Sequence, residues 1–115
     1  LRVGNLDARR DMTDVRDVVE AYDTLLAHAP AGRAFNICSG RAWKVGDLLD
    51  ELLQLARVPI KVLPDDARMR PADIPVIQGD ASRIRAEFGW APRIRVEQML
   101  SDTLEWWRGE TLAGR

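Results

Sequence analysis

The 115-residue sequence has little of several features that would point to secretion, membranes or nucleic acid. Its one cysteine, Cys38, cannot form a disulfide within the chain, which fits a reducing compartment such as the cytoplasm. No apolar run approaches the roughly 20 residues of a membrane-spanning helix, and no signal peptide is visible. The formal net charge of -1 gives no bulk field that would recruit nucleic acid. These absences predict a soluble protein without a membrane or nucleic-acid partner.

Motifs for cofactor binding and catalysis are missing as well. The sequence contains neither Gly-x-Gly-x-x-Gly nor a P-loop, so no helix start is expected to cradle a pyrophosphate. It has no cluster of cysteine and histidine with metal-ligand spacing. The single tyrosine, Tyr22, lies among apolar helix positions with no lysine four residues later, so we expect it in the core. The chain alone is therefore predicted to have no acid–base or nucleophilic activity and no oxidoreductase activity.

The composition that is present, 46% hydrophobic and 30% charged, is typical of a small globular domain. Apolar spacing predicts amphipathic helices around Val19, Leu49 and Leu104, with these three residues on buried faces. Thr13 or Asp14 can cap the first helix. A further apolar patch is expected to stay exposed.

Shorter elements complete an α/β fold with about four helices. A short helix is predicted over 82–88, capped by Asp80 and ended by Gly89. Short strands are predicted within 1–6 and over 33–38 and 60–63. Residues 8–13 are interpreted as a loop or a short strand, and 76–77 is an apolar run. One of the adjacent Trp106 and Trp107 should be buried, because neighbouring helix positions point in different directions. We assign 1–108 to one lobe and 109–115 to a frayed tail.

The stretch 68–80 has the pattern of a stiff loop over a binding site. Two prolines remove backbone donors and restrict the residues before them. Arg70 and Asp73 lie on this loop, and a fixed guanidinium can bind phosphate through two hydrogen bonds. A carboxylate can accept hydrogen bonds from a sugar diol or from a base N–H. The alternative is a surface loop whose arginines pair with nearby acidic residues.

Asn36 is a further candidate, because it comes near the end of the strand predicted over 33–38, just before a Ser-Gly turn. Its amide could bind a ligand or could brace the turn. Cys38 has no histidine or second cysteine near it in sequence, so we interpret it as a packing residue. His28, near the end of a helix, is interpreted as a solvated or capping side chain.

Five short blocks occur in an order that resembles a known family. The blocks are Gly-Asn-Leu-Asp-Ala-Arg-Arg-Asp at 4–11, Thr-Asp-Val-Arg-Asp-Val-Val at 13–19, Asn-Ile-Cys-Ser-Gly at 36–40, Arg-Pro-Ala-Asp-Ile-Pro at 70–75 and Phe-Gly-Trp at 88–90. Together they resemble the C-terminal, substrate-binding part of extended short-chain dehydrogenases/reductases, the NAD-dependent epimerase/dehydratase family that acts on nucleotide sugars. The resemblance covers nearly the whole chain up to Arg108.

Within this family the chain looks most similar to the reductases of GDP-4-dehydro-6-deoxy-D-mannose, which form GDP-D-rhamnose. GDP-mannose 4,6-dehydratases usually carry Arg-Asp-Trp-Gly-His where this chain has Arg-Asp-Met-Thr-Asp at 10–14. They also tend to carry Ala-Thr-Gly where it has Cys-Ser-Gly at 38–40. The alternatives are the same lobe of a dehydratase or of a 4-epimerase, and a stand-alone binding module without catalysis.

The resemblance implies a two-part, cytoplasmic and homodimeric enzyme. An N-terminal Rossmann domain would hold NAD(P) and the catalytic Ser/Thr, Tyr and Lys, and it would lie outside this chain. The start at Leu1, without a methionine, is interpreted as that of a fragment. The C-terminal lobe would bind the nucleotide-diphosphate sugar. The resemblance places Arg10 and Arg70 at the diphosphate, Asp73 at the ribose hydroxyls and Asn36, less directly, at the ligand.

The chain departs from the family at two helix starts. Lys44 and Arg95 stand where relatives often have serine or threonine. Loss of each cap typically costs about 1 kcal/mol, and a cation at a helix start opposes the helix dipole. The departure is therefore expected to lower the stability of the lobe and to leave its ligand site intact.

Overall fold

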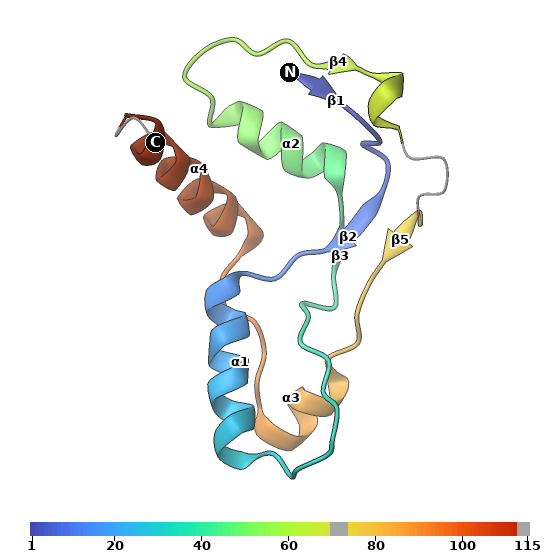
Figure 1. Ribbon diagram of the computed structural model, residues 1–115, viewed down its shortest axis with the longest axis vertical. Helices are drawn as coiled ribbons and strands as arrows, with labels where there is room; N and C mark the ends of the chain where they lie inside the picture. The colour runs from blue at the N-terminus through green and yellow to red at the C-terminus, as the bar shows by residue number, and fades with distance from the viewer. Residues whose placement is uncertain (70–73, 113–115) are drawn as a thin grey trace.

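The computed structural model describes residues 1–69 and 74–112, which form four α-helices, a short 3-10 helix and five short strands. Helices α1 and α3 lie at one end of the molecule and α2 and α4 at the other, with a small sheet between them (Figure 1). The molecule extends 49 × 37 × 23 Å, and its radius of gyration is 17.2 Å. A compact domain of this length would have a radius of about 13 Å. The elongated shape separates two apolar clusters.

A three-stranded sheet in the order β3–β2–β5 connects the two ends. The central strand β2, Arg9–Asp11, runs antiparallel to β3, Ala42–Lys44, and parallel to β5, Val76–Ile77. Residues 8–13, expected to form a loop or a short strand, contain β2. The apolar run at 76–77 forms β5, and neither β5 nor β3 was predicted as a strand. Because three residues are too few for a clear alternating pattern, the sequence carried no signal for β3.

A second, two-stranded sheet pairs β1, Arg2–Val3, in parallel with β4, Leu63–Pro64. The strand predicted over 60–63 is wrong in position, because the ladder forms at its C-terminal end. The Leu63 N–H donates to the Leu1 carbonyl at 2.9 Å, and the Asp65 N–H donates to the Val3 carbonyl at 2.9 Å. Pro64 has no N–H to donate and lies between these two hydrogen bonds. The 3-10 helix Asp66–Arg68 follows directly.

Helix α1, Val15–His28, begins at the predicted cap. The Asp14 carboxylate accepts a hydrogen bond from the Arg16 backbone N–H at 2.8 Å, which satisfies one of the free donors of the first turn. The helix buries Asp17 and Ala21. These two residues are small or polar, so the helix contacts the rest of the chain through a narrow face.

The apolar positions that were expected to be buried on α1 are exposed. Tyr22 is 56% exposed and Val19 is 59% exposed, so the predictions that they lie in the core are wrong. Val15 and Leu26 are also exposed, at 70% and 88%. These four residues recur at helical spacing and form one apolar strip, which we call the α1 stripe. Such a strip on a soluble chain usually marks a surface that contacts other protein.

The segment 33–41, which belongs wholly to the described residues, contains no assigned strand, so the strand predicted over 33–38 is wrong. It runs from the end of α1 past α3 to β3 (Figure 1). Its alternating pattern persists, because Phe35 and Ile37 are half-buried while Ala34 and Asn36 are exposed. An alternating segment becomes a strand only when a neighbouring strand provides the hydrogen-bonded ladder. The alternating pattern is therefore present, but among the described residues no strand pairs with this segment.

The first apolar cluster, called here the α1–α3 core, packs α1 against the segment 33–41 and α3, Ser82–Phe88. Its buried residues are Ala21, Cys38, Ala81, Ile84 and Trp90, with Leu25, Phe35, Ile37 and Phe88 half-buried around them. The packing role predicted for Cys38 is confirmed. Asp80 accepts a hydrogen bond from the Ser82 N–H at 2.8 Å, and Gly89 ends α3 with φ of 68°, a conformation that favours glycine.

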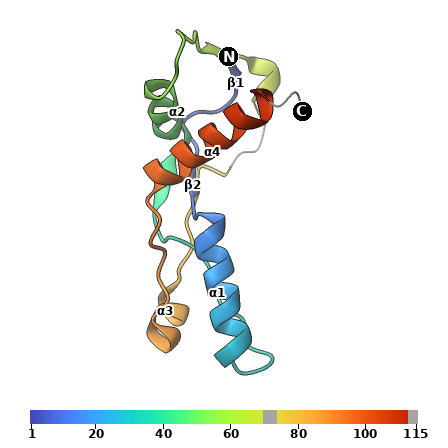
Figure 2. The ribbon, with the colours of Figure 1, turned by 90° about the vertical axis from the view of Figure 1, so that its left-hand side faces the viewer.

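The second cluster, the α2–α4 core, packs α2, Val45–Gln54, against α4, Val96–Leu112. Figure 2 shows α4 and α2 together in the half of the molecule opposite α1 and α3. The buried residues are Leu48, Val96 and Leu100, with Met12, Trp43, Leu52 and Met99 half-buried around them. Among the described residues, no helix is both long and apolar enough to cross a membrane.

The ends of these two helices differ from expectation in two ways. Helix α4 continues through Gly109 to Leu112, beyond the expected start of a frayed tail. Trp106 and Trp107 are 58% and 59% exposed and pack edge to face against each other, so the prediction that one of them is buried is wrong. Lys44 caps α2 without a side-chain hydrogen bond and pairs instead with Asp7 at 2.8 Å.

Candidate functional site

Arg10 lies at the centre of β2, the middle strand of the sheet. Its Nη1 donates to the carbonyl oxygens of Arg9 and Ile74, both at 2.8 Å. The Arg9 N–H donates to the Pro75 carbonyl at 2.7 Å. These contacts fix the guanidinium at the start of β5. A guanidinium carries five N–H donors, so it can hold backbone carbonyls and bind an anion together.

The predicted partners of Arg10 come directly before Ile74 in sequence. Arg70 and Asp73 lie outside the described residues, so their predicted places at a ligand remain predictions. The structure does bring Arg10 to Ile74, the first described residue after this stretch, although the two are far apart in sequence. In the described part of the chain, Ile74 is therefore the point at which this stretch can be related to the Arg10 guanidinium.

The sheet register adds an aromatic neighbour to Arg10. Arg10 is directly opposite Trp43 in β3 and Ile77 in β5, so the three side chains belong to the same face of the sheet. Trp43 is half-buried, and the Arg41 guanidinium lies 3.8 Å from its ring centroid in a cation–π contact. The Trp43 indole is thus the neighbour of Arg10 in the sheet register and of Arg41 through the cation–π contact.

Asn36 is held in a different way. Its Nδ2 donates to the Asp80 carbonyl at 3.1 Å, and the residue is exposed. This hydrogen bond joins the segment 33–41 to the residues just before α3. The contact agrees with the bracing alternative, because the amide links two backbone segments of the protein.

Asp11, the residue after Arg10, was not singled out by the sequence analysis. Its Oδ1 accepts hydrogen bonds from the Ser39 N–H at 2.8 Å and the Ser39 hydroxyl at 2.6 Å. Its Oδ2 accepts from the Gly40 N–H at 2.9 Å and the Gly79 N–H at 3.1 Å. Burial alone would raise the pKa of Asp11, but the hydrogen bonds from Ser39, Gly79 and Gly40 outweigh it and hold the pKa below its usual value.

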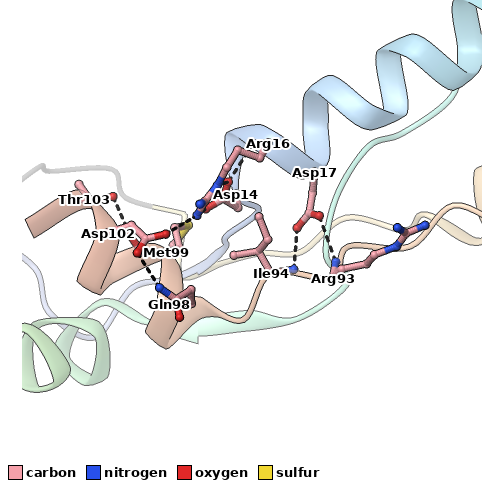
Figure 3. A network of polar contacts seen from close by, with 9 residues as sticks. All are labelled: Asp14, Arg16, Asp17, Arg93, Ile94, Gln98, Met99, Asp102 and Thr103. Carbon is pink, nitrogen blue, oxygen red and sulfur yellow. Dashed lines mark hydrogen bonds and ion pairs between the residues drawn. The ribbon is translucent and has the colours of Figure 1, made fainter. Parts of the chain in front are cut away.

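A separate polar network joins α1 to α4 (Figure 3). Arg16 binds the Asp14 carboxylate at 2.8 Å and the Asp102 carboxylate at 2.7 Å. The hydrogen bonds that Arg16 donates to Asp14 and Asp102 raise the pKa of Arg16, which therefore stays charged. Because about half of the Arg16 side chain is exposed, solvent screens both of its ion pairs. The network orients the two helices and adds little to stability.

Asp17 holds the connection between α3 and α4 (Figure 3). Its two carboxylate oxygens accept hydrogen bonds from the backbone N–H groups of Arg93 and Ile94 at 3.1 and 3.0 Å. Its backbone carbonyl accepts the indole N–H of Trp90 at 3.2 Å. The side chain is buried, and both of its oxygens have donors, so we interpret Asp17 as structural.

A groove of about 360 Å³ lies between the sheet and the start of α4. Arg41, Arg93 and Arg95 contribute to its wall together with Trp43 and Glu97. Arg93 pairs with Glu20 at 3.0 Å and Arg95 with Glu97 at 3.3 Å, so much of this positive charge is already balanced. Among residues 1–69 and 74–112, no group of three metal-ligating side chains comes together.

Comparison with known proteins identifies the type of chain. The family described as GDP-mannose 4,6 dehydratase matches residues 1–103. A GDP-6-deoxy-D-mannose reductase of Pseudomonas aeruginosa is 39% identical over 107 residues, which are 93% of this chain and 35% of that protein.

Solved structures agree with the sequence match. The structure of RMD from Pseudomonas aeruginosa complexed with NADPH superposes with a TM-score of 0.87 at 36% identity, covering 96% of this chain and 36% of that one. A UDP-glucose 4-epimerase from Stenotrophomonas maltophila, with bound NAD and formylated UDP-arabinopyranose, gives a TM-score of 0.82 at 26% identity over 98% of this chain and 36% of that one. The chain thus spans about a third of the length of these relatives.

Proposed function

Because the chain belongs to the GDP-mannose 4,6 dehydratase family, we propose that it is the nucleotide-sugar-binding lobe of an NAD(P)-dependent reductase. The reaction would be reduction of the C4 ketone of GDP-4-dehydro-6-deoxy-D-mannose to GDP-D-rhamnose. The observation that carries this proposal is the 39% identity to a GDP-6-deoxy-D-mannose reductase across 93% of the chain. The resemblance described from the sequence blocks at 4–11, 36–40 and 70–75 is confirmed at the level of the family.

The cofactor belongs to a part of the enzyme outside these residues. The starts of α1 and α4 do not fit a dinucleotide pyrophosphate, because Asp14 caps α1 and Glu97 lies in the first turn of α4. A carboxylate there uses the free N–H groups and repels a second anion. Two relatives were solved with NADPH or NAD bound, and this chain spans about a third of each. We therefore assign NAD(P) binding and hydride transfer to the remaining two thirds.

We assign the substrate to the region around Arg10. Arg10 and Arg70 would bind the diphosphate, which offers enough acceptor oxygens for two guanidinium groups. Asp73 would accept hydrogen bonds from the adjoining ribose, and Asn36 would have a smaller share. The contact of Arg10 with Ile74 supports this assignment, because Ile74 follows Asp73 directly in the sequence.

The exposed α1 stripe offers a contact surface for the rest of the enzyme. Four apolar side chains on one helix face remain open to solvent, and the segment 33–41 beside the helix alternates like a strand without forming one. Burial of a Val or Leu side chain contributes roughly 1.5–3 kcal/mol, so covering the stripe would stabilise the lobe strongly. We propose that the Rossmann domain covers it, in a cytoplasmic enzyme that forms homodimers.

A second candidate function is that of a dehydratase or 4-epimerase that uses the same lobe. The solved epimerase with a TM-score of 0.82 favours it, since the same fold there accompanies a bound UDP-sugar. A third candidate is a binding module without chemistry. The lobe contacts that we describe are compatible with all three, so an activity assay has to separate them.

The test uses the natural full-length protein with NADPH and GDP-4-dehydro-6-deoxy-D-mannose. We expect oxidation of NADPH with formation of GDP-D-rhamnose. Absorbance at the nicotinamide band measures the oxidation, and chromatography identifies the sugar product. The isolated 115-residue chain under the same conditions should give no turnover. Activity on GDP-mannose or on a UDP-sugar instead would favour the dehydratase or epimerase, and no activity on any of them would favour the module.

Three substitutions at two positions test the residue assignment in the full-length protein. Arg70→Ala should weaken GDP binding by roughly 1.5–3 kcal/mol, the scale of a hydrogen bond to a charged group. Arg70→Lys should recover part of this loss, because a point charge cannot replace the planar fork. Asp73→Ala should cost less and should act on the ribose. Unchanged GDP affinity in Arg70→Ala would end the assignment.

A further inference from the structure

Asp11 is the junction at which three separate segments of the chain meet. Its four hydrogen bonds reach the turn at Ser39 and Gly40, which precedes β3, and Gly79, which follows β5. Each carboxylate oxygen receives two donors. All four donors belong to Ser39, Gly40 or Gly79, so the carboxylate joins both neighbours of β2 at the same end of the sheet.

The fit around this carboxylate is tight. A Cβ at Gly79 would lie 2.5 Å from the Cys38 Sγ and 3.7 Å from Asp11 Oδ2, so only glycine allows its N–H to approach. The Gly40 φ of 76° turns a second N–H toward the same group. The Gly40 carbonyl in turn accepts a hydrogen bond from Gln78 Nε2 at 2.6 Å. The junction is therefore held from several sides around one acceptor.

The neighbouring residue acts at the other end of β5. Arg10 holds Ile74, before this strand, and Asp11 holds Gly79, after it. Strand β5 is two residues long, so its own ladder provides few hydrogen bonds to fix its position. Together the two side chains determine where β5 lies along β2.

We propose that Asp11 is a positioning residue for the diphosphate site, an inference that rests on the proposed function. It would act through β5 and the loop end at Ile74, and it would not contact the ligand. A carboxylate suits this role because it offers only acceptors to four donors. An asparagine in the same place would turn N–H groups toward backbone N–H groups and lose part of the junction.

The direction in which Asp11→Asn changes the GDP affinity separates a positioning role from a simple electrostatic one. Asp11 follows Arg10 directly, so its negative charge by itself disfavours an anion nearby. By charge alone, Asp11→Asn should strengthen GDP binding. A positioning role predicts the opposite, roughly a tenfold weaker affinity, on the scale seen when a supporting residue behind a ligand-binding group is changed. A purely structural role predicts no change in affinity once the folded fraction is taken into account.

The experiment measures GDP binding by calorimetry in the full-length protein, with Asp17→Asn as the matched control. Asp17 is a buried carboxylate that, like the half-buried Asp11, accepts hydrogen bonds from backbone N–H groups, but its donors are Arg93 and Ile94. We expect both variants to lose stability in urea and only Asp11→Asn to lose GDP affinity. Ser39→Ala removes one of the four donors to Asp11 and should weaken binding by a smaller factor, roughly twofold to threefold.

Each outcome decides between the ideas. Wild-type affinity or tighter binding in Asp11→Asn overturns the positioning role and leaves the proposed function intact. If Asp11→Asn does not fold, wild-type affinity in Ser39→Ala overturns it in the same way. Equal losses of affinity in Asp11→Asn and Asp17→Asn also overturn it, because the effect is then a general one. Absence of GDP binding by the wild-type protein refutes the proposed function and the inference together.

Discussion

The two apolar clusters stabilise their halves of the molecule differently. In the α2–α4 core two helices cover each other, and Leu48, Val96 and Leu100 lie between them. In the α1–α3 core, α1 contributes only Ala21 to the buried apolar set, and its larger apolar residues face solvent. The α1–α3 half depends more on polar anchors, chiefly Asp17 and its contacts with the 90–94 connection.

This difference indicates which half needs more protein around it. A helix face with four exposed apolar residues, beside an alternating segment without a strand partner, is suited to a neighbour that provides both a strand and a cover. The α2–α4 half depends less on additional protein for its stability, although Trp106 and Trp107 remain exposed on it. We infer that the α1–α3 half is the one that the rest of the enzyme completes.

The largest expected effect concerns a buried tryptophan. Trp90→Ala should lower the free energy of unfolding by about 3–5 kcal/mol, because Trp90 is 5% exposed and donates a hydrogen bond to the Asp17 carbonyl. Trp106→Ala, in the other half, should cost less than about 1 kcal/mol, since Trp106 is 58% exposed. Urea unfolding followed by circular dichroism measures both. Equal losses would show that the α1–α3 core does not depend on Trp90.

Hydrogen exchange can sharpen the comparison on the same variant. If the two clusters unfold separately, Trp90→Ala should remove protection from α1 and α3 amides and spare those of α2 and α4. Uniform loss of protection would mean that the clusters form one cooperative unit, despite their separation.

Two glycines offer a matched pair with effects of opposite sign. Gly79→Ala should destabilise the chain by roughly 1–3 kcal/mol, because its Cβ would lie 2.5 Å from the Cys38 Sγ and 2.7 Å from the Cys38 Cβ. Gly109→Ala should stabilise it by about 0.5–1 kcal/mol, since Gly109 lies within α4 and a Cβ there meets nothing within 4 Å. Thermal unfolding gives both values. Two changes of the same sign would contradict the close approach at Cys38.

Acid should weaken the sheet junction. The pKa of Asp11 is held below its ordinary value of about 3.9. The stabilisation that follows is complete above that ordinary pKa and is lost as the pH falls through the lower, folded-state pKa. The free energy of unfolding of the wild-type chain should therefore decrease below about pH 4 more steeply than that of Asp11→Asn. Urea titrations at several pH values measure the slopes, and parallel slopes would exclude this role of the carboxylate.

The smallest expected effect is on the α1 stripe. Leu26→Gln should change the stability of the 115-residue chain by no more than about 0.5 kcal/mol, because Leu26 is 88% exposed and glutamine is a good helix former. In the full-length protein the same change should cost more, since we propose that this side chain is covered there. A loss above about 1 kcal/mol in the short chain would mean that Leu26 already packs within it.

Helix positions could be predicted well from the sequence, because capping and spacing are local signals. Asp14 and Gly89 marked two helix ends correctly. Burial on α1 could not be predicted, since Val19 and Tyr22 have the pattern of a covered face but are exposed in this chain; we propose that the rest of the enzyme covers them. The strand expected over 33–38 failed for the same reason, because a ladder requires two strands.

The candidate site was predicted in part. Arg10 was found through a sequence block, and the structure adds its contact with Ile74. Asp11 was missed, because its partners Ser39, Gly40 and Gly79 are distant in sequence and no local pattern reports their convergence. An acidic residue in a strand next to an arginine, with two Gly-containing turns elsewhere in the chain, was the only available sign.

The central claim is that Arg10 belongs to a diphosphate-binding site, and calorimetric titration of GDP into the full-length protein tests it most directly. Arg10→Ala should weaken GDP binding by about 1.5–3 kcal/mol. Arg57→Ala should leave it unchanged, because Arg57 is an exposed arginine that pairs with Glu105 on α4. Wild-type GDP affinity in Arg10→Ala, or an equal loss in Arg57→Ala, would contradict the account.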